Sequence, residues 1–471
     1  MRSSESMDEI YRHFEDFSNV SIFLAYNVNV DALKYLKYPK DVYGLIGDFN
    51  EEELISKIEE YPRVIENPLD FVSRLIHAMR SGKPVEVPIK NTPELDSYFN
   101  SMVYDEERIG GQVGIISNLL SILNLKKIIA YSPILSKKQS QMFNNSENLV
   151  FPTEFNGKLV LKKPIDSFGN DELKINRIFE YPENLSISLK NITVTSKRAN
   201  RFIAASRPEN LRIEVHENLK SHLSKIGKMV DCAILSGFQA IKQSYLDGKT
   251  SDYYLDNAIE DIKLLKSQNP DLKVHLEFAS IQDIIIRKKI ADYILPHVDC
   301  IGMDEAEIAN IINSLGYSEL SEGILKNSRL EDVIKASKIL LEQYNLDGVQ
   351  IHTLYYIMYI CKKGGILSEE SLEKTLEFAT ILASTKASLG EINTTKDLEV
   401  GLNTPYNKHG NLLKEIAKNI SIQKEYEKYN IVLVPSRIVK NPKSTVGLGD
   451  TISSGAFVGY ISELKKAKSK N

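Results

Sequence analysis

The feature that most constrains the fold of this chain is a repeated alternation of short apolar runs, rich in β-branched residues, with longer amphipathic segments. The runs have the length of buried strands, and the segments have the period of helices. The runs are Val20–Ala25, Lys127–Tyr131, Val230–Ser236, Val274–Ala279, Val298–Met303, Val349–His352 and Ile431–Val434. The clearest helical segments are Asp332–Tyr344, Ser371–Ser388 and Ile452–Lys466. This order predicts an α/β fold with a mainly parallel central sheet covered on both faces and sites at the carboxyl ends of its strands.

Two stretches, 33–109 and 151–210, interrupt this alternation and carry short runs of alternating polarity, such as Lys158–Lys162 and Leu185–Lys190. Such runs suit a small, half-exposed sheet. We therefore expect a small α+β lid domain made of these two insertions. The large domain would comprise 1–32, 110–150 and 211–471, in keeping with a length of 471 residues.

The charge and cysteine content restrict the compartment and the partners. The chain has 63 acidic and 59 basic residues, so its net charge of −4 gives no reason to expect nucleic acid or anionic membrane as a partner. Residues 1–14 contain no apolar leader core, and no run of 18 apolar residues occurs, so we expect a cytoplasmic protein. Cys232, Cys300 and Cys361 lie far apart in apolar stretches and are predicted to be buried thiols.

A glycine-rich segment near the C-terminus, Ser444–Ala456, follows a predicted strand and opens a predicted helix. Gly447 and Gly449 would let backbone N–H groups approach an anion, and the helix N-terminus adds partial positive charge. The segment is neither a Walker loop nor a dinucleotide GxGxxG, because Ile452 stands where the third glycine should be. We predict a phosphate site, with Asp450 either as a base or as a simple N-cap.

Two acidic elements follow neighbouring predicted strands. Alternation places His275 and Glu277 on the same side of their strand, and Asp304–Glu307 begins the helix after the next one. Carboxylates at strand ends are where a magnesium ion could be held through water and phosphate oxygens. An exposed edge carboxylate and a favourable helix first turn are the alternatives for the two elements.

Polar residues also follow the first strand. Asn27, Asn29 and Asp31 form a cluster suited to binding a polyol, and Gly110–Gly114 precedes a helix, where Gln112 could reach the same ligand. A plain turn and helix cap is the alternative for this glycine-rich segment.

Taken in order, the HxE at His275 and Glu277, the NxxE-like element Asp304–Glu307 and the GxGD at Gly447–Asp450 resemble the ADP-dependent sugar kinases. This family comprises archaeal ADP-dependent phosphofructokinases and glucokinases of the ribokinase-like superfamily. The resemblance extends over nearly the whole chain and implies a ribokinase-like three-layer sandwich with a lid. One departure is that Asp304 stands where the family usually has Asn, while Glu307 is retained.

The resemblance implies transfer of the β-phosphoryl group of ADP to a sugar hydroxyl, with Asp450 as the base and Gly447 and Gly449 at the phosphoryl group. It implies Mg²⁺ as cofactor, with Glu277, Glu307 and Asp450 at the metal. The implied nucleotide contacts are His352, Thr353, Val434, Val446 and Gly447, where the two valines could sandwich the purine. The choice of ADP over ATP comes from the resemblance alone.

The implied sugar contacts are Asn29, Asp31, Gly111 and Gln112, joined by a cluster that contains Asn200, Arg201 and Arg207. Guanidinium groups bind phosphate bidentately, so the cluster favours fructose 6-phosphate, with Lys162 or Arg177 as possible additions. One arginine could serve the nucleotide instead, and the roles of Arg198, Arg201 and Arg207 stay undivided.

The acceptor and the catalytic class each leave an alternative. Glu86 resembles the glucokinase pattern, so glucose is a second candidate acceptor. The other readings are an ATP-using ribokinase relative and a non-catalytic sugar or nucleotide sensor. The sequence leaves the oligomeric state open.

Overall fold

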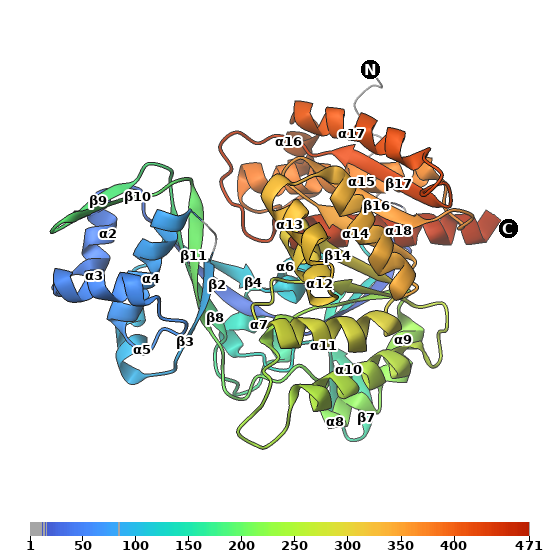
Figure 1. Cartoon of the computed structure of the whole chain (residues 1–471). Helices are drawn as coiled ribbons and strands as arrows, with labels where there is room; N and C mark the ends of the chain where they lie inside the picture. Colours follow the sequence, from blue (N-terminus) through green and yellow to red (C-terminus); the bar gives the residue numbers. More distant parts are fainter. Residues whose placement is uncertain (1–11, 13–14, 16, 83–84, 471) are drawn as a thin grey trace.

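The computed structural model describes residues 12, 15, 17–82 and 85–470. Most of the N-terminal stretch in which we expect no leader segment, and Lys83 and Pro84 beside Glu86, lie outside these residues. Two bodies are visible in the ribbon, a large one built around a broad sheet and a smaller one formed by residues of the N-terminal half (Figure 1).

Within the described residues, the broad sheet has ten strands and confirms the expected α/β architecture. Neighbouring strands pair in parallel except at its two edges, where β15, β16 and β17, and likewise β6 and β7, pair antiparallel. In sheet order the strands are β17 (Tyr429–Pro435), β16 (Tyr356–Lys362), β15 (Gly348–His352), β14 (Cys300–Asp304), β13 (Lys273–Glu277), β12 (Cys232–Leu235), β1 (Ser21–Ala25), β5 (Lys127–Ala130), β6 (Leu149–Phe155) and β7 (Lys158–Lys162).

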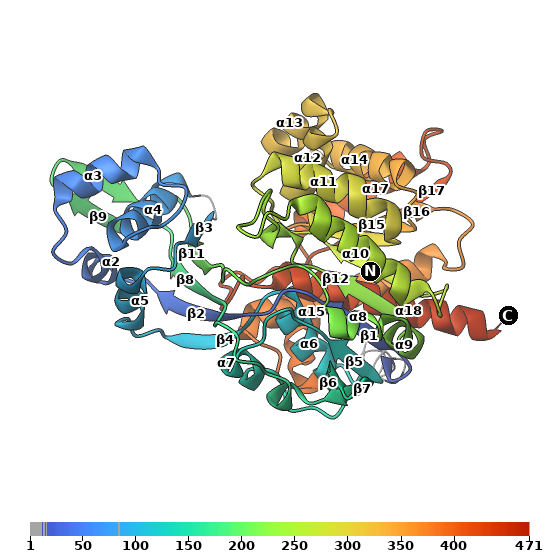
Figure 2. The ribbon, with the colours of Figure 1, turned by 90° about the horizontal axis from the view of Figure 1, so that it is seen from below.

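Helices cover both faces of this sheet, as the alternating sequence predicts, because each central strand is apolar on both sides (Figure 2). One core contains Phe23, Leu235 and Leu276 with side chains from one helix layer, and the other contains Ile22, Ile234 and side chains from the opposite layer. The first layer comprises α9 (Leu223–Met229), α10 (Ser251–Lys266), α11 (Ile284–Ile294), α12 (Glu305–Ser314), α13 (Ser318–Asn327), α14 (Leu330–Gln343) and α17 (Lys408–Ser421). The second comprises α6 (Gln112–Ile122), α15 (Glu369–Leu389) and α18 (Leu448–Lys470).

The smaller body is built on a five-stranded sheet with its own core, in which Phe71 packs against the rings of Phe99, Phe179 and Phe202. The five strands are those found among the described residues. In sheet order the strands are β3 (Val85–Ile89), β11 (Asn200–Ser206), β8 (Ile175–Tyr181), β2 (Asn29–Tyr35) and β4 (Glu106–Gly110). A separate hairpin is formed by β9 (Ser186–Leu189) and β10 (Ile192–Thr195). The helices are α2 (Pro39–Ile46), α3 (Glu51–Glu60), α4 (Pro68–Ser81) and α5 (Pro93–Asn100).

Short helices connect these elements. They are α7 (Lys137–Gln141), α8 (Glu217–Lys220), α16 (Leu398–Leu402) and the 3₁₀ turns η1 (Pro164–Asp166), η2 (Phe238–Ala240), η3 (Leu295–His297) and η4 (Thr395–Asp397).

The structure corrects one part of the expected division of the chain. Lys158–Lys162 forms β7 at the edge of the large sheet, not a strand of the small one. Its polar alternation reflects an edge strand with one exposed face, which looks the same in sequence as a small half-exposed sheet. The small sheet also begins earlier than expected, at Asn29. We therefore propose a lid that spans about 29–110 and 175–206.

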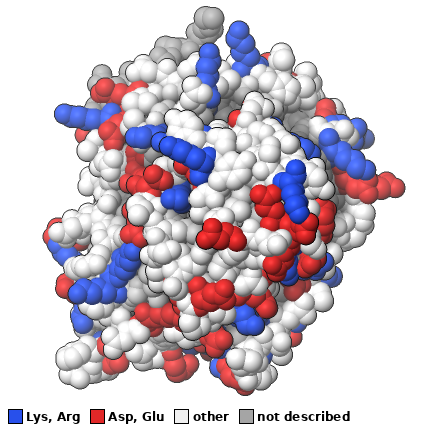
Figure 3. All heavy atoms as spheres, turned by 90° about the vertical axis from the view of Figure 1, so that its left-hand side faces the viewer, with Lys and Arg blue, Asp and Glu red and all other residues white. Residues whose placement is uncertain are grey.

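Charged side chains of both signs are distributed over the surface. On the face that carries the small body, Lys and Arg are interspersed with Asp and Glu, without a broad field of one sign (Figure 3). Among the described residues, no helix combines the length and apolar character that crossing a bilayer requires. All three cysteines are free thiols, with Cys232 and Cys300 buried and Cys361 partly exposed.

Candidate functional site

A polar cleft of about 250 Å³ lies between the small sheet and the carboxyl ends of strands in the large sheet. It brings together residues that are far apart in the sequence and come from both bodies. Ten of the predicted site residues line it: Asn29, Asp31, Glu86, Gly111, Gln112, Arg201, Arg207, Val446, Gly447 and Asp450. The cleft therefore joins the proposed sugar ligands to the glycine-rich loop.

Asn29 and Asp31 form one wall of this cleft from β2. Because side chains alternate along a strand, the two residues share one face, and Asn29 Nδ2 donates to Asp31 Oδ1 over 2.7 Å. Burial raises the pKa of Asp31 to about 6, although Arg108 and the hydrogen bond from Asn29 act in the opposite direction. Gly110 of β4 lies directly against both side chains, and a Cβ there would collide with each of them.

A buried chain of three side chains forms the next wall. Lys174 Nζ donates to Asn27 Oδ1, and Asn27 Nδ2 donates to Gln112 Oε1 over 2.5 Å. Gly111 has a positive φ of 74°, and a Cβ there would lie 2.5 Å from the carbonyl oxygen of Asn27. Both observations require glycine at this position. Lys174 lines the cleft, and burial lowers its pKa to about 8.

Lys174 and its neighbour Asn176 were missed at the sequence level, where Lys162 and Arg177 were the expected additions. Alternation along β8 explains the correction, since Asn176 and Ile178 face the cleft while Arg177 lies on the opposite face. There the Arg177 guanidinium packs 4.5 Å from the centre of the Phe99 ring. Lys162 lies at the end of β7, at the edge of the large sheet. The alternation pattern around Ile175–Ile178 was the signal available in the sequence.

The arginines on and next to β11 separate into two positions. Arg201 Nη1 donates to Thr445 Oγ1 over 3.0 Å, beside the glycine-rich loop, whereas Arg207 Nη2 lies 3.3 Å from Glu86 Oε1. Both line the cleft because they share the strand face with Ile203 and Ala205. Asn200 is on the other face and donates to the carbonyl oxygen of Gly82, as Arg198 also does.

The glycine-rich loop turns directly into α18. Gly447 has a φ of 70°, and its carbonyl oxygen accepts hydrogen bonds from the backbone N–H and the hydroxyl of Thr451. A Cβ at Gly449 would lie 2.8 Å from His352 Nε2, so this position requires glycine. The first N–H groups of a helix lack intrahelical partners and carry partial positive charge, which makes this turn a suitable phosphate site.

Asp450 lies within the first turn of α18 rather than before it, and it faces the cleft. The N-cap interpretation is therefore wrong for this residue. Burial raises the pKa of Asp450 to about 6; the nearby Asp31 acts in the same direction, and Lys386 and Arg201 oppose the shift. At neutral pH the group is an ionised carboxylate that accepts a proton more readily than an ordinary aspartate.

Besides Asp450, the residues predicted to bind the metal come from the end of β13 and the start of α12. His275 Nε2 and Glu277 Oε2 are 3.1 Å apart, as their shared strand face predicts. Burial, followed by the charges of Asp450 and Glu307, raises the pKa of Glu277 well above its usual value. Asp304 and Glu307 form a reciprocal capping box at the start of α12, with distances of 2.7 and 2.8 Å.

These acidic groups fit a Mg²⁺ ion whose coordination shell is completed by water and substrate phosphates, rather than one that is enclosed by protein side chains alone. Within the described ranges, no three His, Cys, Asp or Glu side chains form a cluster that could hold a metal ion by themselves. The charges of Asp450 and Glu307 nevertheless raise the pKa of Glu277, and the charge of Asp450 raises that of Glu307, so a nearby cation would relieve this repulsion. Mg²⁺ usually binds through one or two carboxylates, with water and substrate phosphates completing its shell.

The predicted nucleotide residues have different environments. His352 is half-buried at the end of β15 beside Gly449, and its buried Nδ1 has no hydrogen-bond partner among the described residues. Thr353 uses its hydroxyl to hold the turn at Tyr355 and Tyr356. Val434 is fully buried in the core with Ile357 and Ile452, and it offers no surface to a base.

Val446 also lies away from the predicted position. It packs against Leu33 and Ile178 of the small sheet, on the side of the cleft that carries the sugar ligands. The predicted purine sandwich between Val434 and Val446 is therefore not formed, because apolar character alone does not separate a core valine from a ligand contact.

Comparisons with known proteins show what the whole chain is similar to. The model of the ADP-specific phosphofructokinase/glucokinase conserved region matches residues 20–459. The chain is 50% identical to an ADP-specific phosphofructokinase of Thermococcus litoralis over 96% of this chain and 98% of that protein. A crystal structure of a hypothetical ADP-dependent phosphofructokinase from Pyrococcus horikoshii OT3 is 44% identical, covers 96% of this chain and 99% of that chain, and superposes with a TM-score of 0.83.

A second solved structure is an ADP-dependent kinase in complex with fructose 6-phosphate and ADPβS. It is 38% identical to this chain, covers 99% of this chain and 100% of that one, and has a TM-score of 0.85.

The close approach of Gly110 to Asn29 and Asp31 gives a direct test of the sugar wall. We expect Gly110→Ala to weaken binding of the predicted acceptor, fructose 6-phosphate, by roughly tenfold or more, because the new methyl group displaces both polar side chains. Isothermal titration calorimetry would measure the affinity, and thermal unfolding would report the stability. Gly44→Ala is the matched control, since no atom lies within 4 Å of its Cβ position. Unchanged affinity in Gly110→Ala would remove these two residues from the sugar site.

Proposed function

Since the chain belongs to the ADP-specific phosphofructokinase/glucokinase family, we propose that it transfers the β-phosphoryl group of ADP to fructose 6-phosphate, giving fructose 1,6-bisphosphate and AMP. The observation that carries this proposal is the composition of the cleft. A general base at a glycine-rich helix N-terminus and two cationic side chains for a phosphate ester line the same cavity of about 250 Å³. Relatives with this activity and a related complex containing both ligands support the choice of substrates.

In the proposed reaction, Asp450 accepts the proton of the attacking sugar hydroxyl. Its raised pKa of about 6 suits this role, since the carboxylate is ionised at neutral pH yet basic enough to take the proton as the new bond forms. The amides of the Gly447–Gly449 turn and the α18 N-terminus stabilise the negative charge that develops on the transferred group. The polar wall around Asn29 and Asp31 orients the acceptor so that its hydroxyl faces Asp450.

Mg²⁺ would be held through water by Glu277 and Glu307, with Asp450 facing the same region. When bound, it neutralises charge on phosphate oxygens of the donor. The buried His275 stays neutral, because burial lowers its pKa to about 3, and it therefore adds no positive charge of its own beside Glu277. His352 and Thr353 are proposed to lie near the nucleotide.

The positions of the arginines support a division of their roles. Arg201 is bonded to Thr445, next to the glycine-rich loop, and is proposed to contact the transferred phosphoryl group. Arg207 and Lys174 line the part of the cleft near Glu86 and are proposed to bind the 6-phosphate of the acceptor. Asn200 and Arg198 support this strand through the carbonyl oxygen of Gly82.

Glucose is a second proposed acceptor, and the ion pair between Glu86 and Arg207 favours it. With fructose 6-phosphate bound, Arg207 would turn to the phosphate. Without a phosphate, Glu86 keeps Arg207 neutralised and can also accept a hydrogen bond from a sugar hydroxyl. The same pair of residues thus accommodates an acceptor with or without a phosphate ester.

The catalytic role of Asp450 is tested by Asp450→Asn. We expect turnover with Mg-ADP and fructose 6-phosphate to fall by about 10² to 10⁴, because the variant lacks the general base, while both ligands still bind. A coupled assay would compare ADP with ATP, and fructose 6-phosphate with glucose, at equal Mg²⁺. Asp256→Asn, on the exposed face of α10, is the control. Nearly full activity of Asp450→Asn would show that Asp450 is not the general base. If the unaltered protein binds ADP but shows no turnover with any pair of donor and acceptor, the alternative of a non-catalytic sugar or nucleotide sensor would be favoured.

The role of Lys174 predicts a dependence on pH. Its lowered pKa of about 8 means that the ammonium is charged below this pH and loses its charge as the pH rises through it. We therefore expect kcat/KM for fructose 6-phosphate to fall between pH 7 and 9.5, while kcat/KM for glucose does not show this step. Lys174→Gln should give a low and level profile for fructose 6-phosphate. Identical profiles for the two sugars would contradict the assignment.

The role of Glu86 predicts a change in sugar preference. We expect Glu86→Ala to lower kcat/KM for glucose by roughly tenfold, because a hydrogen-bond acceptor is lost, and to preserve or raise it for fructose 6-phosphate, because Arg207 is released. Steady-state kinetics with both sugars would measure the ratio. Glu183→Ala, at an exposed position of the same body, is the control. Equal losses with both sugars would show that Glu86 does not distinguish them.

A further inference from the structure

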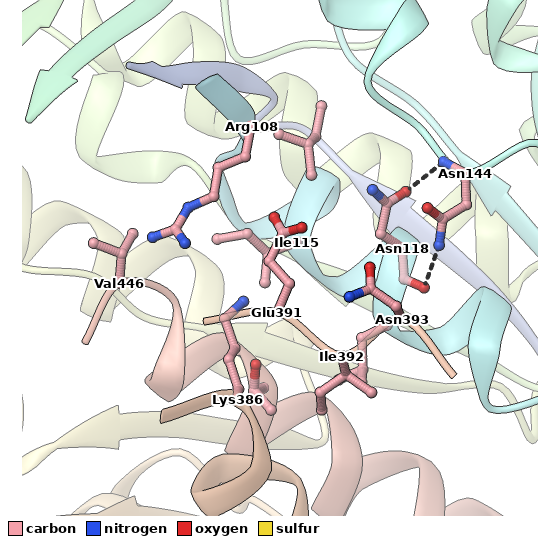
Figure 4. Close-up of a pocket in the computed structure, with 12 residues that line it drawn as sticks. Arg108, Ile115, Asn118, Asn144, Lys386, Glu391, Ile392, Asn393 and Val446 are labelled. Carbon is pink, nitrogen blue, oxygen red and sulfur yellow. Dashed lines mark hydrogen bonds between the residues drawn. The ribbon is translucent and has the colours of Figure 1, made fainter. Parts of the chain in front are cut away.

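A second and smaller pocket, of about 50 Å³, lies next to the glycine-rich loop (Figure 4). It shares Ile115 and Val446 with the large cleft but contains none of the proposed sugar ligands. Its wall combines β4 of the small sheet with α6, the end of α15 and the start of α18, so that both bodies contribute to it. The proposed kinase reaction assigns no role to this pocket.

Arg108 of β4 supplies the first cationic group. Its side chain is only 7% exposed, and Nη2 donates to Ser444 Oγ over 2.7 Å. Nη1 is also buried but has no hydrogen-bond partner among the described residues, and its nearest carboxylate oxygen, on Glu106, is 4.0 Å away. Buried guanidinium groups are normally satisfied, so Nη1 keeps an unused donor on a residue that lines the pocket.

Lys386, near the end of α15, supplies the second cationic group. Its Nζ would lie 3.2 Å from a Cβ at Gly447, which places the ammonium directly beside the glycine-rich loop. Within the described part of the chain, no hydrogen bond or ion pair is formed by this side chain. Burial, and after it the charge of Arg108, lower the pKa of Lys386 to about 8, against the effect of Asp450, Glu391 and Asp31.

Carboxylates act on this pair from outside the pocket, since Asp31 interacts with both cations and Asp450 interacts with Lys386. Figure 4 shows the guanidinium of Arg108 and the ammonium of Lys386 directed towards each other. The side chains of Asn118 and Asn144 are used in hydrogen bonds between these two residues and to nearby backbone. Glu391 is the only carboxylate among the residues that line the pocket. The volume is sufficient for a group the size of a few water molecules.

We propose that this pocket binds a small inorganic oxyanion of the phosphate or sulfate type, held between Arg108 and Lys386. The planar guanidinium matches two oxygens of such an ion, and the ammonium adds a compact positive charge on the other side. An ion in this position joins β4 to α15 beside the loop, and so favours the arrangement in which Arg108 holds Ser444. Its binding does not depend on which sugar or nucleotide the enzyme uses.

The test is calorimetric titration of inorganic phosphate and of sulfate into the full chain with its cleft saturated by fructose 6-phosphate and ADPβS. We expect one saturable site in the unaltered protein, binding that is roughly tenfold or more weaker in Lys386→Gln, and recovery in Lys386→Arg. Lys443→Gln is the matched control, because this lysine is exposed and lies just before Ser444. Circular dichroism would verify that each variant is folded.

Three outcomes would overturn the proposal. They are the absence of saturable anion binding when the cleft is occupied, equal binding in Lys386→Gln and the unaltered protein, and an equal loss in Lys443→Gln. A parallel titration with AMP distinguishes a free ion from the phosphate of an organic molecule. Binding of AMP under these conditions, without binding of either inorganic ion, would also contradict it.

Discussion

The structure depends on balancing the negative charge of several buried or half-buried acidic groups around the glycine-rich turn at Gly447–Asp450. Asp31, Glu277, Glu307 and Asp450 all have pKa values raised by burial, and each comes from a different element. Taking carboxylates out of water is unfavourable unless positive charge lies nearby. Arg201 and Lys386 act on Asp450 in this way from the two sides of the loop. Charge balance therefore links the small sheet, α15 and α18.

The sequence predicts much of this arrangement because its strongest signals are local. Each β-branched run forms a strand of the large sheet, and all but Ile431–Val434, which forms the edge strand β17, lie inside it, since strands buried on both faces are apolar at every position. The face shared by His275 and Glu277 follows from the period of a strand. The turn at Gly447–Asp450 is recognisable because its glycines are close together in the sequence, and Gly447 has the positive φ that favours glycine. These features depend on residues that are close together along the chain.

The features that the sequence does not predict arise from contacts between distant segments. Lys174 becomes a site residue only because β8 lies between β2 and β11, and the same strand carries Arg177 to the opposite face. β7 resembles a strand of the small sheet, since edge strands of either sheet have one exposed face. Val434 resembles a ligand contact in composition but belongs to the core. In each of these cases the role of a residue or strand depends on which segments lie next to it in the fold, and a single sequence does not give that information.

The position of both arginines along one extended segment gives the cleft a fixed internal scale. Arg201 and Arg207 share a strand face, six positions apart, and a strand rises by about 3.3 Å per residue. Hydrogen bonds to β3 and β8 on either side keep this segment straight. In the proposed roles of these arginines, the backbone of this strand would set the spacing between the 6-phosphate of the acceptor and the phosphoryl group that is transferred. The strand would thus favour acceptors of one length.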